Sequence, residues 1–250
     1  MRYGVCHLSI VPIRILPDDS EEIISQLLYG DYFKVLESRK KWSRIRISHD
    51  ACEGWVINDQ FTNILESDFQ KLDATQNHKF SSDIISHIDT ENGLFIPIIM
   101  GSIVSSSQFL KHKFEGEHIK GKKPKSGLVD TALLYLGAPY MWGGKTPFGI
   151  DCSGLTQMVY KVNGYQLKRS SAEQSKQGEA LSFIEESEPG DLAFFDNPEG
   201  IIDHVGIILK DNYIIHVHGH VRIDRIDHTG IFNTHEKRYT HKLRVIKKVI

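Results

Sequence analysis

Residues 139–160 read PYMWGGKTPFGIDCSGLTQMVY, and this stretch decides how the C-terminal half of the chain folds. Two adjacent glycines are followed, from Cys152 to just before Gly164, by apolar side chains at steps of three and four residues. That spacing predicts a helix with Cys152 in its first turn. A helix start offers free backbone N–H groups and a partial positive charge, which lower a thiol pKa and can bind an oxyanion. The alternative interpretation is a small buried hydrophobic residue.

On either side of this stretch, helical patterns come first and strand patterns follow. Residues 128–137, LVDTALLYLG, have helical spacing and end at Gly137. The later runs read as strands bounded by Asp, Asn and Gly, namely DLAFFD, HVGIIL, NYIIHVH, VRIDRI and LRVIKKVI. Helices followed by strands predict an α+β domain with an antiparallel sheet.

A nucleophilic thiol needs a base, and the thirteen histidines have to be separated by context. His204 opens the strand HVGIIL, and His216 lies twelve residues later in YIIHVH. Two antiparallel strands joined by the turn KDN bring these rings together, with His204 facing Cys152 and His216 orienting His204. Taken singly, each histidine equally fits a core or surface position.

The N-terminal half reads as small β modules. Residues 1–65 alternate the strand-like runs VPIRIL, YFKVLES, WSRIRIS and GWVI with turn signals, which predicts a small antiparallel barrel. Residues 66–121 begin with a polar connector. They continue with GLFIPIIMGSIVSSS and QFLKHKF, which favour a second small β unit, and end in a Gly- and Lys-rich linker. The predicted domains are therefore 1–65, 66–121 and 122–250.

Composition limits the function classes. Thirty basic residues against 32 acidic ones give a net charge of -2, which offers no case for a nucleic-acid or anionic-membrane partner. The N-terminus lacks a signal-peptide pattern, and no run approaches the roughly 18 apolar residues of a membrane helix. Three cysteines, an odd number, suit a reducing compartment. We expect a cytoplasmic, monomeric protein without a cofactor that acts on a small neutral or zwitterionic ligand.

Several motifs together resemble a known family. PYMWGG, DCSGL, KRSSAEQ, PGDLAFF and DHVGIIL with IIH, in this order over about 122–250, look like the NlpC family of papain-like cell-wall peptidases. The resemblance implies that Cys152 is the nucleophile, His204 the base and His216 the residue that orients the base. The run SEEIISQLLYGDYFKVLESRKKWSRIRI with GWV resembles a bacterial SH3-like module, and MGSIVSSSQFLKHKFEGEHI resembles a second, degenerate copy. The implied fold is a papain-like catalytic domain preceded by one or two SH3-like barrels.

This resemblance also implies a substrate. Two SH3-like modules ahead of such a domain are typical of the subgroup that cuts free murein peptides between γ-D-glutamate and the diamino acid, in peptidoglycan recycling. That subgroup requires an unblocked N-terminal L-alanine. By motif position, Glu22, Tyr140 and Asp151 hold the substrate amine, and Ser153 and Ser171 lie near the glutamyl carboxylate.

The binding residues have alternative interpretations. Asp151 directly before a helix fits an N-cap, while a buried ammonium also needs a matching carboxylate. Tyr140 and Trp142 either pack the loop or form a wall of the substrate site. The family often has a tyrosine two residues before the GW of the first module, where this chain has Cys52. This departure leaves open which acid of the first module binds the amine.

Rival functions remain at this stage. His216, His218 and His220 alternate along one strand face, a pattern that fits a metal site, but no Asp, Glu or Cys cluster completes it at familiar spacing, so we predict no metal. A non-catalytic peptide-binding module is a second rival, but a protein that only binds a peptide does not need the set of Cys152 and two histidines. A papain-like acyltransferase or amidase would use the same residues. The sequence does not separate hydrolysis from acyl transfer, or diaminopimelate from lysine in the substrate.

Overall fold

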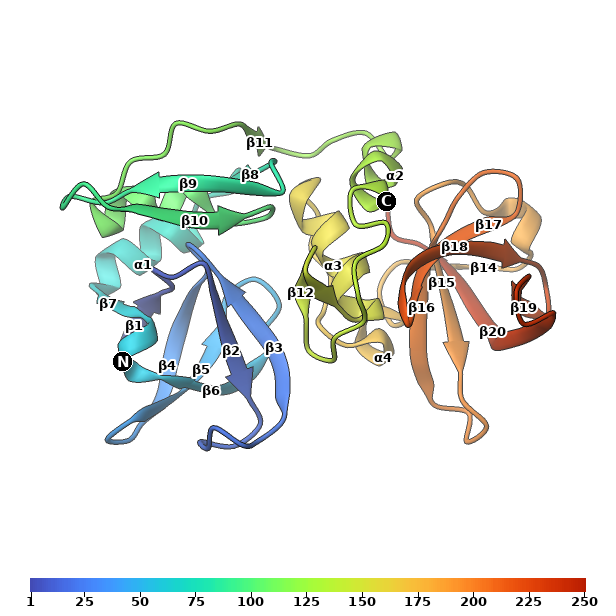
Figure 1. The fold of residues 1–250 in the computed structure, drawn as a ribbon, viewed down its shortest axis with the longest axis horizontal. Coiled ribbons are helices and arrows are strands. Elements are labelled where there is room, and N and C mark those ends of the chain that lie inside the picture. Colours follow the sequence, from blue (N-terminus) through green and yellow to red (C-terminus); the bar gives the residue numbers. More distant parts are fainter. The chain divides into compact units, whose positions relative to one another are not determined.

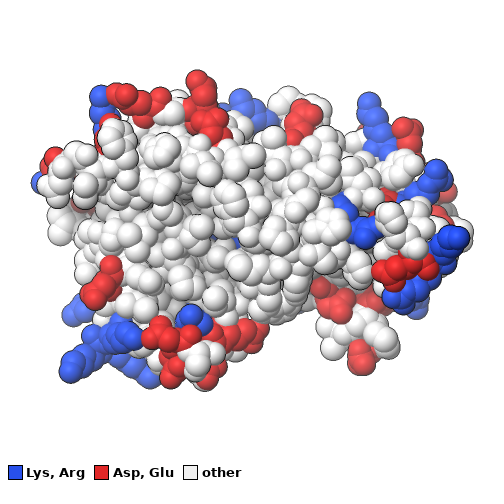
Figure 2. Space-filling view, in the orientation of Figure 1, with Lys and Arg blue, Asp and Glu red and all other residues white.

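The computed structural model describes residues 1–250, which form two compact units. The N-terminal unit comprises residues 1–122 with 164–166, and the C-terminal unit comprises 123–163 with 167–250. No helix in the chain combines the length and the apolar character that a membrane crossing requires. On the face drawn in Figure 2, acidic and basic side chains are interspersed, in keeping with the nearly balanced charge of the sequence.

The first part of the N-terminal unit is a seven-stranded antiparallel sheet, drawn in blue in Figure 1. Its order is β3-β2-β6-β5-β4-β1-β7. Inward side chains alternate with outward ones along β5, so one face covers an apolar core. The strands are β1 (Arg2–Val5), β2 (Ile10–Arg14), β3 (Ile23–Leu28), β4 (Tyr32–Ser38), β5 (Trp42–Ile47), β6 (Glu53–Ile57) and β7 (Thr62–Ile64), with the 3-10 helix η1 (Asn58–Gln60) between the last two.

The rest of the N-terminal unit shares core residues with this sheet. Tyr3 and Tyr32 of the sheet pack in one cluster with Phe69, Phe80 and Ile103. Strands β9 and β10 form one hairpin, and β8 pairs with β11. The elements are α1 (Glu66–Asp73), β8 (Lys79–Ser81), β9 (Ile85–Asp89), β10 (Phe95–Ile99), η2 (Val104–Leu110) and β11 (His118–Lys120).

Part of the segment expected to form a second β unit is helical. The residues VSSSQFL, which span the two runs read as that unit, form the 3-10 helix η2. Three consecutive serines break the alternation of apolar and polar residues that marks a half-buried strand, so the sequence gives no reason to continue β10 beyond Ile99.

The C-terminal unit begins with helices, as expected. The predicted helix at the nucleophile is α3 (Cys152–Val162), and Gly164 follows it with a φ of 83°. The helix expected up to Gly137 ends earlier, because α2 (Ser126–Leu133) gives way to a series of i→i+3 hydrogen bonds from Leu134 to Leu136. The short elements nearby are β12 (Lys145–Thr146), β13 (Gly149–Ile150) and α4 (Ser171–Gln174).

A second seven-stranded antiparallel sheet completes this unit. Its order is β14-β20-β15-β16-β17-β18-β19, and β19 also pairs with β20, which closes six strands into a ring. Figure 1 shows α2, α3 and α4 grouped together beside this sheet. The strands are β14 (Glu179–Leu181), β15 (Leu192–Asp196), β16 (Ile202–Ile208), β17 (Tyr213–His218), β18 (His220–Ile226), β19 (Gly230–Asn233) and β20 (Arg238–Lys248), with η3 (Ile184–Glu186) before β15.

The expected fold class is therefore confirmed: an α+β domain with an antiparallel sheet follows a small β barrel. The sequence pattern missed β14 and β19, which have three and four residues. Strands this short carry too little alternation to be recognised, and with them the closure of the ring went unpredicted.

Candidate active site

Cys152 is the first residue of α3, and the loop before it is built to hold that helix start. Asp151 is the N-cap, and its Oδ1 accepts a hydrogen bond from the backbone N–H of Gly154 at 2.6 Å. Its Oδ2 accepts one from the N–H of Gly143 at 2.9 Å. A Cβ on Gly154 would lie 2.3 Å from the carbonyl oxygen of Gly144, so only glycine lets the loop approach the helix this closely.

The carboxylate of Asp151 is also paired with a buried arginine. Nη1 and Nη2 of Arg169 donate to its two oxygens at 3.0 and 2.6 Å, and the hydroxyl of Ser153 donates to Oδ1 at 3.2 Å. A carboxylate has about four acceptor sites, and these donors with the two backbone N–H groups use that capacity. The N-cap interpretation of Asp151 is confirmed. A substrate ammonium would have to compete with Arg169 for this group, and amine binding by Asp151 stays a prediction.

The run KRSSAEQ supplies the other supports of the helix start. Arg169 comes from this run, and so does the buried Gln174, whose Nε2 donates to the carbonyl oxygen of Ser153 at 2.9 Å. The hydroxyl of Thr156 donates to Oε1 of Gln174 at 2.7 Å. Sequence reasoning quoted this run as part of the family pattern but gave a role only to Ser171, so the positioning function of Arg169 and Gln174 was missed.

The thiol of Cys152 lies against β16 on both sides of His204. Sγ is 3.7 Å from the carbonyl oxygen of Asp203, and the backbone N–H of Val205 hydrogen-bonds to the sulfur. Burial, with a smaller contribution from the Asp151 carboxylate, raises the pKa of the Cys152 thiol to about 12, although the N–H groups of Val205 and Ser153 act in the opposite direction. The lowering expected from the helix start is therefore present but smaller than the effect of burial. The resting side chain is a neutral thiol.

The two predicted histidines do meet. Strands β16 and β17 are antiparallel, and Gly206 pairs with His216, so His204 lies diagonal to His216 on the same face. Nε2 of His204 is 2.9 Å from Nδ1 of His216, and both side chains are buried. Gly206 makes room for this diagonal, since a Cβ there would stand 2.9 Å from the Cβ of His216.

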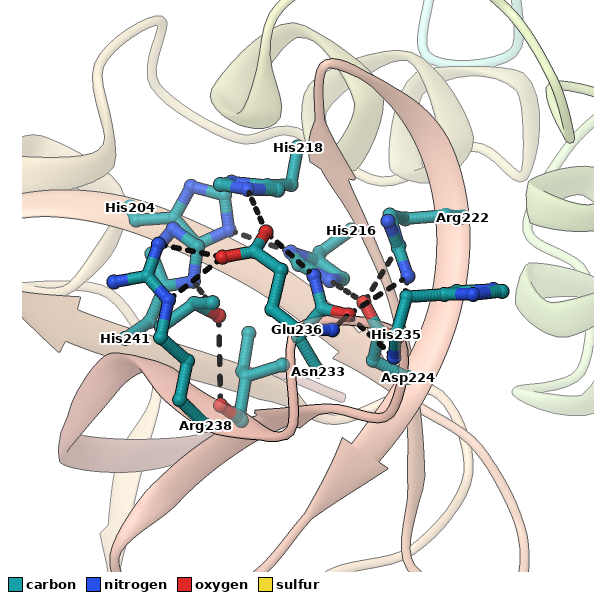
Figure 3. A network of polar contacts seen from close by, with 12 residues as sticks. His204, His216, His218, Arg222, Asp224, Asn233, His235, Glu236, Arg238 and His241 are labelled. Carbon is teal, nitrogen blue, oxygen red and sulfur yellow. Dashed lines mark hydrogen bonds and ion pairs between the residues drawn. The ribbon is translucent and has the colours of Figure 1, made fainter.

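The polar row continues to a residue that sequence reasoning missed. Nε2 of His216 lies 3.0 Å from Oδ2 of Asp224 on β18 (Figure 3). The exposed fractions of His204, His216 and Asp224 are 7%, 0% and 3%. Three neighbouring strands thus contribute one member each to a connected, buried row.

Burial and mutual proximity keep the two histidines of this row uncharged. The pKa of His204 lies well below its ordinary value, first because of burial and then because of His241, His216 and His218 nearby. Burial also lowers the pKa of His216, although Asp224 acts in the opposite direction. A neutral imidazole is the form that accepts a thiol proton, so His204 is poised as a base.

A third histidine, His241 of β20, stacks on His204. The two ring centroids are 4.0 Å apart with planes at 22°, and Nδ1 of His241 is 2.9 Å from the hydroxyl of Thr240. Burial lowers the pKa of His241 to about 3, with smaller contributions from His216 and His218. Sequence reasoning missed this residue, because RYTHK lacks the apolar alternation of the strand that it begins.

These three histidines are also the group most able to hold a metal ion, since one ligand atom from each of His204, His216 and His241 lies within 4.8 Å of the others. They differ from the alternating set considered above, in which His218 is half-buried and His220 exposed. Two of these nitrogens, Nε2 of His204 and Nδ1 of His216, already face each other at hydrogen-bonding distance, whereas the ligand atoms of one ion have to turn towards the ion. The arrangement fits proton transfer along hydrogen bonds better than coordination.

The predicted substrate residues are spread over different elements. Tyr140 and Trp142 are exposed on the loop before β12, and burial with the charges of Asp151 and Cys152 raises the pKa of Tyr140, which places its ring near the nucleophile. Ser171 is buried in α4, and its hydroxyl donates to the carbonyl oxygen of Ile202. Glu22 is exposed directly before β3 in the N-terminal unit. Their binding roles stay predictions.

Both halves of the chain match known protein families. Residues 137–244 match the model of the NlpC/P60 family, and residues 13–61 match that of the bacterial dipeptidyl-peptidase SH3 domain. A gamma-D-glutamyl-L-lysine dipeptidyl-peptidase of Bacillus subtilis (strain 168) is 31% identical over 135 residues, which are 53% of this chain and 44% of that protein. A second relative, dipeptidyl-peptidase 6 of Lysinibacillus sphaericus, is 26% identical over 80% of this chain and 82% of that protein.

A third relative and a solved structure complete the comparison. The gamma-D-glutamyl-L-lysine dipeptidyl-peptidase of Bacillus cereus (strain ATCC 10987) is 41% identical over 36% of this chain and 27% of that protein. The matched segments thus span less than half of the two relatives that carry this name. The crystal structure of an NlpC/P60 family protein from Bacillus cereus ATCC 10987 has a TM-score of 0.81 at 18% identity and covers 99% of both chains, which shows the shared fold.

Taken together, a thiol at a helix start, packed against the backbone on either side of an uncharged histidine, and a buried partner for that histidine lie in a segment that matches the NlpC/P60 family, and these groups suit nucleophilic catalysis by a cysteine.

Proposed function

We propose that this chain is a cysteine endopeptidase that acts on free murein peptides. The match of its C-terminal half to the NlpC/P60 family and of its N-terminal part to the bacterial dipeptidyl-peptidase SH3 domain supports this proposal. It would hydrolyse the bond between γ-D-glutamate and the diamino acid of peptides that begin with an unblocked L-alanine. The observation that carries this proposal is that the Cys152 thiol lies against the backbone on both sides of His204, whose ring in turn contacts His216. Two relatives are named for γ-D-glutamyl-L-lysine, which supports the bond that is cut.

The chemistry follows from the arrangement of these groups. His204 takes the proton of the Cys152 thiol as the sulfur attacks the γ-carbonyl carbon, and a tetrahedral oxyanion forms near the start of α3. The N–H groups of a first helical turn have no intrahelical acceptor, so they suit this oxyanion. The C–N bond then breaks, and His204 gives its proton to the departing amine of the diamino acid. Water next cleaves the thioester, which releases the γ-carboxylate and restores the thiol.

Selection for a free amine is the second part of the proposal. A dipeptidyl-peptidase releases two residues from the N-terminus, so such an enzyme has to recognise that end of its substrate. The predicted amine ligands are Tyr140, Asp151 and Glu22. Because Asp151 is already paired with Arg169, a second acid such as Glu22 would have to supply much of the charge that a buried ammonium needs.

The proposal also includes a place of action. We expect a monomeric, cytoplasmic enzyme of peptidoglycan recycling. Three free cysteines, Cys6, Cys52 and Cys152, fit a reducing compartment. An enzyme that rejects blocked alanine would spare wall precursors in which muramic acid occupies that amine, and would act on recycled peptides only.

The proposal is tested by incubating the full chain with L-Ala-γ-D-Glu-L-Lys, with its diaminopimelate counterpart and with the N-acetyl forms of both, and by identifying products by mass spectrometry. We expect the dipeptide L-Ala-γ-D-Glu from the free peptides only, and one heavy oxygen atom in its γ-carboxylate when the reaction runs in oxygen-labelled water. Cys152→Ala should lower kcat by about 10⁵-fold or more. Cleavage by folded Cys152→Ala, or equal kcat/KM for free and acetylated peptides, would contradict the mechanism or the amine selection, respectively.

The diamino acid preference comes from the same measurement, because the two free peptides differ only in their third residue. Glu22→Gln separates the contribution of the predicted second acid: we expect a higher KM for the free peptide with kcat little changed. An unchanged KM would assign the amine site to other residues.

A further inference from the structure

The buried row that runs from His204 through His216 to Asp224 ends on an arginine. Nη2 of Arg222 donates to Oδ1 of Asp224 at 2.9 Å, and Nε of Arg222 lies 2.7 Å from Oδ2. Arg222 is also 3.5 Å from the side-chain oxygen of Asn233 (Figure 3). Asp224 is therefore held from both sides, by a ring nitrogen of His216 and by a guanidinium group.

The register of the strands explains why these groups form a row. His216 pairs directly with Arg222, so Asp224, two residues further along β18, lies diagonal to His216 on the same face. His204 lies diagonal to His216 in the same way. The same face of this ring carries apolar residues at other positions, among them Phe195 and Ile226. The polar row thus crosses an otherwise apolar interior, where an unmatched charge would be costly.

The protonation state of Asp224 can be argued from its partners. Burial alone would raise the pKa of Asp224, but the hydrogen bonds from His216 and Arg222 outweigh burial and hold the pKa below its ordinary value. An ionised carboxylate only accepts hydrogen bonds. Nε2 of His216 must therefore carry a proton.

This assignment fixes every other proton in the row. A neutral His216 with its proton on Nε2 has a bare Nδ1, and that nitrogen lies 2.9 Å from Nε2 of His204. Nε2 of His204 must then donate, and in a neutral ring its Nδ1 is left without a proton. The facing groups do not alter this logic, because His241 stacks on the His204 ring rather than lying in its plane, and His218 is directed to Glu236.

We propose that Asp224, anchored by Arg222, is a positioning residue that sets the tautomer of His204 through His216, so that Nδ1 of His204 is the atom that receives the Cys152 proton. This inference rests on the proposed function in one respect, that His204 is the base. When His204 gains the proton, its Nε2–H continues to donate to His216, and no hydrogen bond in the row has to reverse. Asp224 stabilises the resulting imidazolium through His216 without becoming protonated.

The first test reads the tautomers directly and requires no substrate. The full chain is labelled with nitrogen-15 in histidine, and long-range proton–nitrogen correlation spectra at neutral pH show which ring nitrogens carry protons. His204→Gln and His216→Gln assign the signals by their disappearance. We expect a proton on Nε2 and a bare Nδ1 in both rings. A proton on Nδ1 of either ring overturns the proposal.

The second test changes the anchor. Asp224→Asn is isosteric, but the amide can donate to Nε2 of His216, which would reverse the row and leave His204 protonated on Nδ1. We expect kcat to fall by about 100- to 10,000-fold with KM little changed, and the proton signal to move to Nδ1 of His204. The matched control is Asp227→Asn in the turn between β18 and β19, which removes another hydrogen-bonded carboxylate, one that accepts from the N–H of Thr229 and the hydroxyl of Tyr239. We expect wild-type kcat in that control.

The outcomes separate the two proposals. Wild-type kcat in folded Asp224→Asn overturns the role of Asp224 while leaving Cys152 and His204 in place. If Asp224→Asn does not fold, the tautomers of the wild-type chain decide the question. A wild-type chain that cleaves no murein peptide contradicts the proposed function, whereas the tautomer measurement still stands or falls on its own.

Discussion

The two units contain sheets of the same size and strand orientation that use buried polar groups in different ways. In the N-terminal sheet, buried carboxylates hold turns: Asp31 accepts from the N–H of Leu28, and Asp50 accepts from the N–H of Cys52, both at 2.9 Å. In the C-terminal sheet, buried polar side chains bond to one another across neighbouring strands. A carboxylate that holds a turn stabilises the backbone, whereas a connected row fixes charge and protons at defined atoms, which is what proton transfer needs.

The largest expected effect separates these two uses of buried polarity. His204→Gln fills a similar space but cannot take a proton, so we expect kcat for the murein peptide to fall by about 10⁴-fold or more. The control is Asp31→Asn in the N-terminal sheet, which should lower the free energy of unfolding by about 1–3 kcal/mol and leave kcat per folded molecule unchanged. Steady-state kinetics and urea unfolding measure both. A His204→Gln protein with kcat within tenfold of wild type would remove the contrast.

A smaller effect is expected at the next member of the row. The amide oxygen of glutamine can accept the Nε2–H of His204, as Nδ1 of His216 does, whereas leucine offers no acceptor. We expect His216→Gln to lose roughly 10- to 100-fold in kcat and His216→Leu roughly tenfold more than that. Equal losses in the two variants would mean that His216 acts through packing alone.

The parts of this row that the sequence could predict are the parts that lie within quoted motifs. Cys152, His204 and His216 each stand at a distinctive position, a helix start or a strand that a tight turn joins to its neighbour. Asp224 has no such distinctive position. In VRIDRI the apolar Val221 and Ile223 alternate with Arg222 and Asp224, so the pattern predicts that the aspartate faces solvent. In the structure Ile223 is partly exposed and Asp224 is buried, since the ring interior is polar at this level.

The fold shows the same division. Binary patterning and turn residues were enough for the class, for the N-terminal barrel and for α3, whose apolar spacing is strong. They were not enough for closure of the C-terminal ring, which depends on β19 and on the extension of β20 back to Arg238. Those segments are strands because neighbouring strands supply hydrogen bonds, a tertiary effect that local sequence does not record.

Buried histidines also make the C-terminal unit sensitive to acid. The pKa values of His204, His216 and His241 all lie below the ordinary value near 6.5, with burial as the first cause. Below pH 6.5 the unfolded chain therefore binds protons that the folded chain does not, and stability falls as pH decreases. Each site contributes up to about 1.4 kcal/mol per pH unit.

This prediction is checked by urea unfolding of the full chain between pH 7.5 and pH 5. We expect the free energy of unfolding to fall towards pH 5, and His241→Phe to flatten the slope because it removes one of the three sites and keeps the stacking on His204. In the N-terminal unit, burial also lowers the pKa of His7 and His112, but both are only partly buried. A pH-independent free energy of unfolding would show that the row is solvated in the folded protein.

The smallest expected effect comes from exchanging sulfur for oxygen at a cysteine of the N-terminal unit. Cys52 is partly buried at the edge of the apolar core, so Cys52→Ser should change the free energy of unfolding by about 1 kcal/mol or less and leave kcat unchanged. Cys6 is fully buried in that core and its thiol donates to the carbonyl oxygen of Leu8, so Cys6→Ser costs somewhat more stability but keeps a donor. The same exchange at Cys152 replaces the nucleophile and abolishes turnover. The three serine variants, assayed together, compare the same exchange of sulfur for oxygen in the N-terminal core and at the nucleophile. A loss of kcat in Cys52→Ser would show that the N-terminal unit takes part in the chemistry itself.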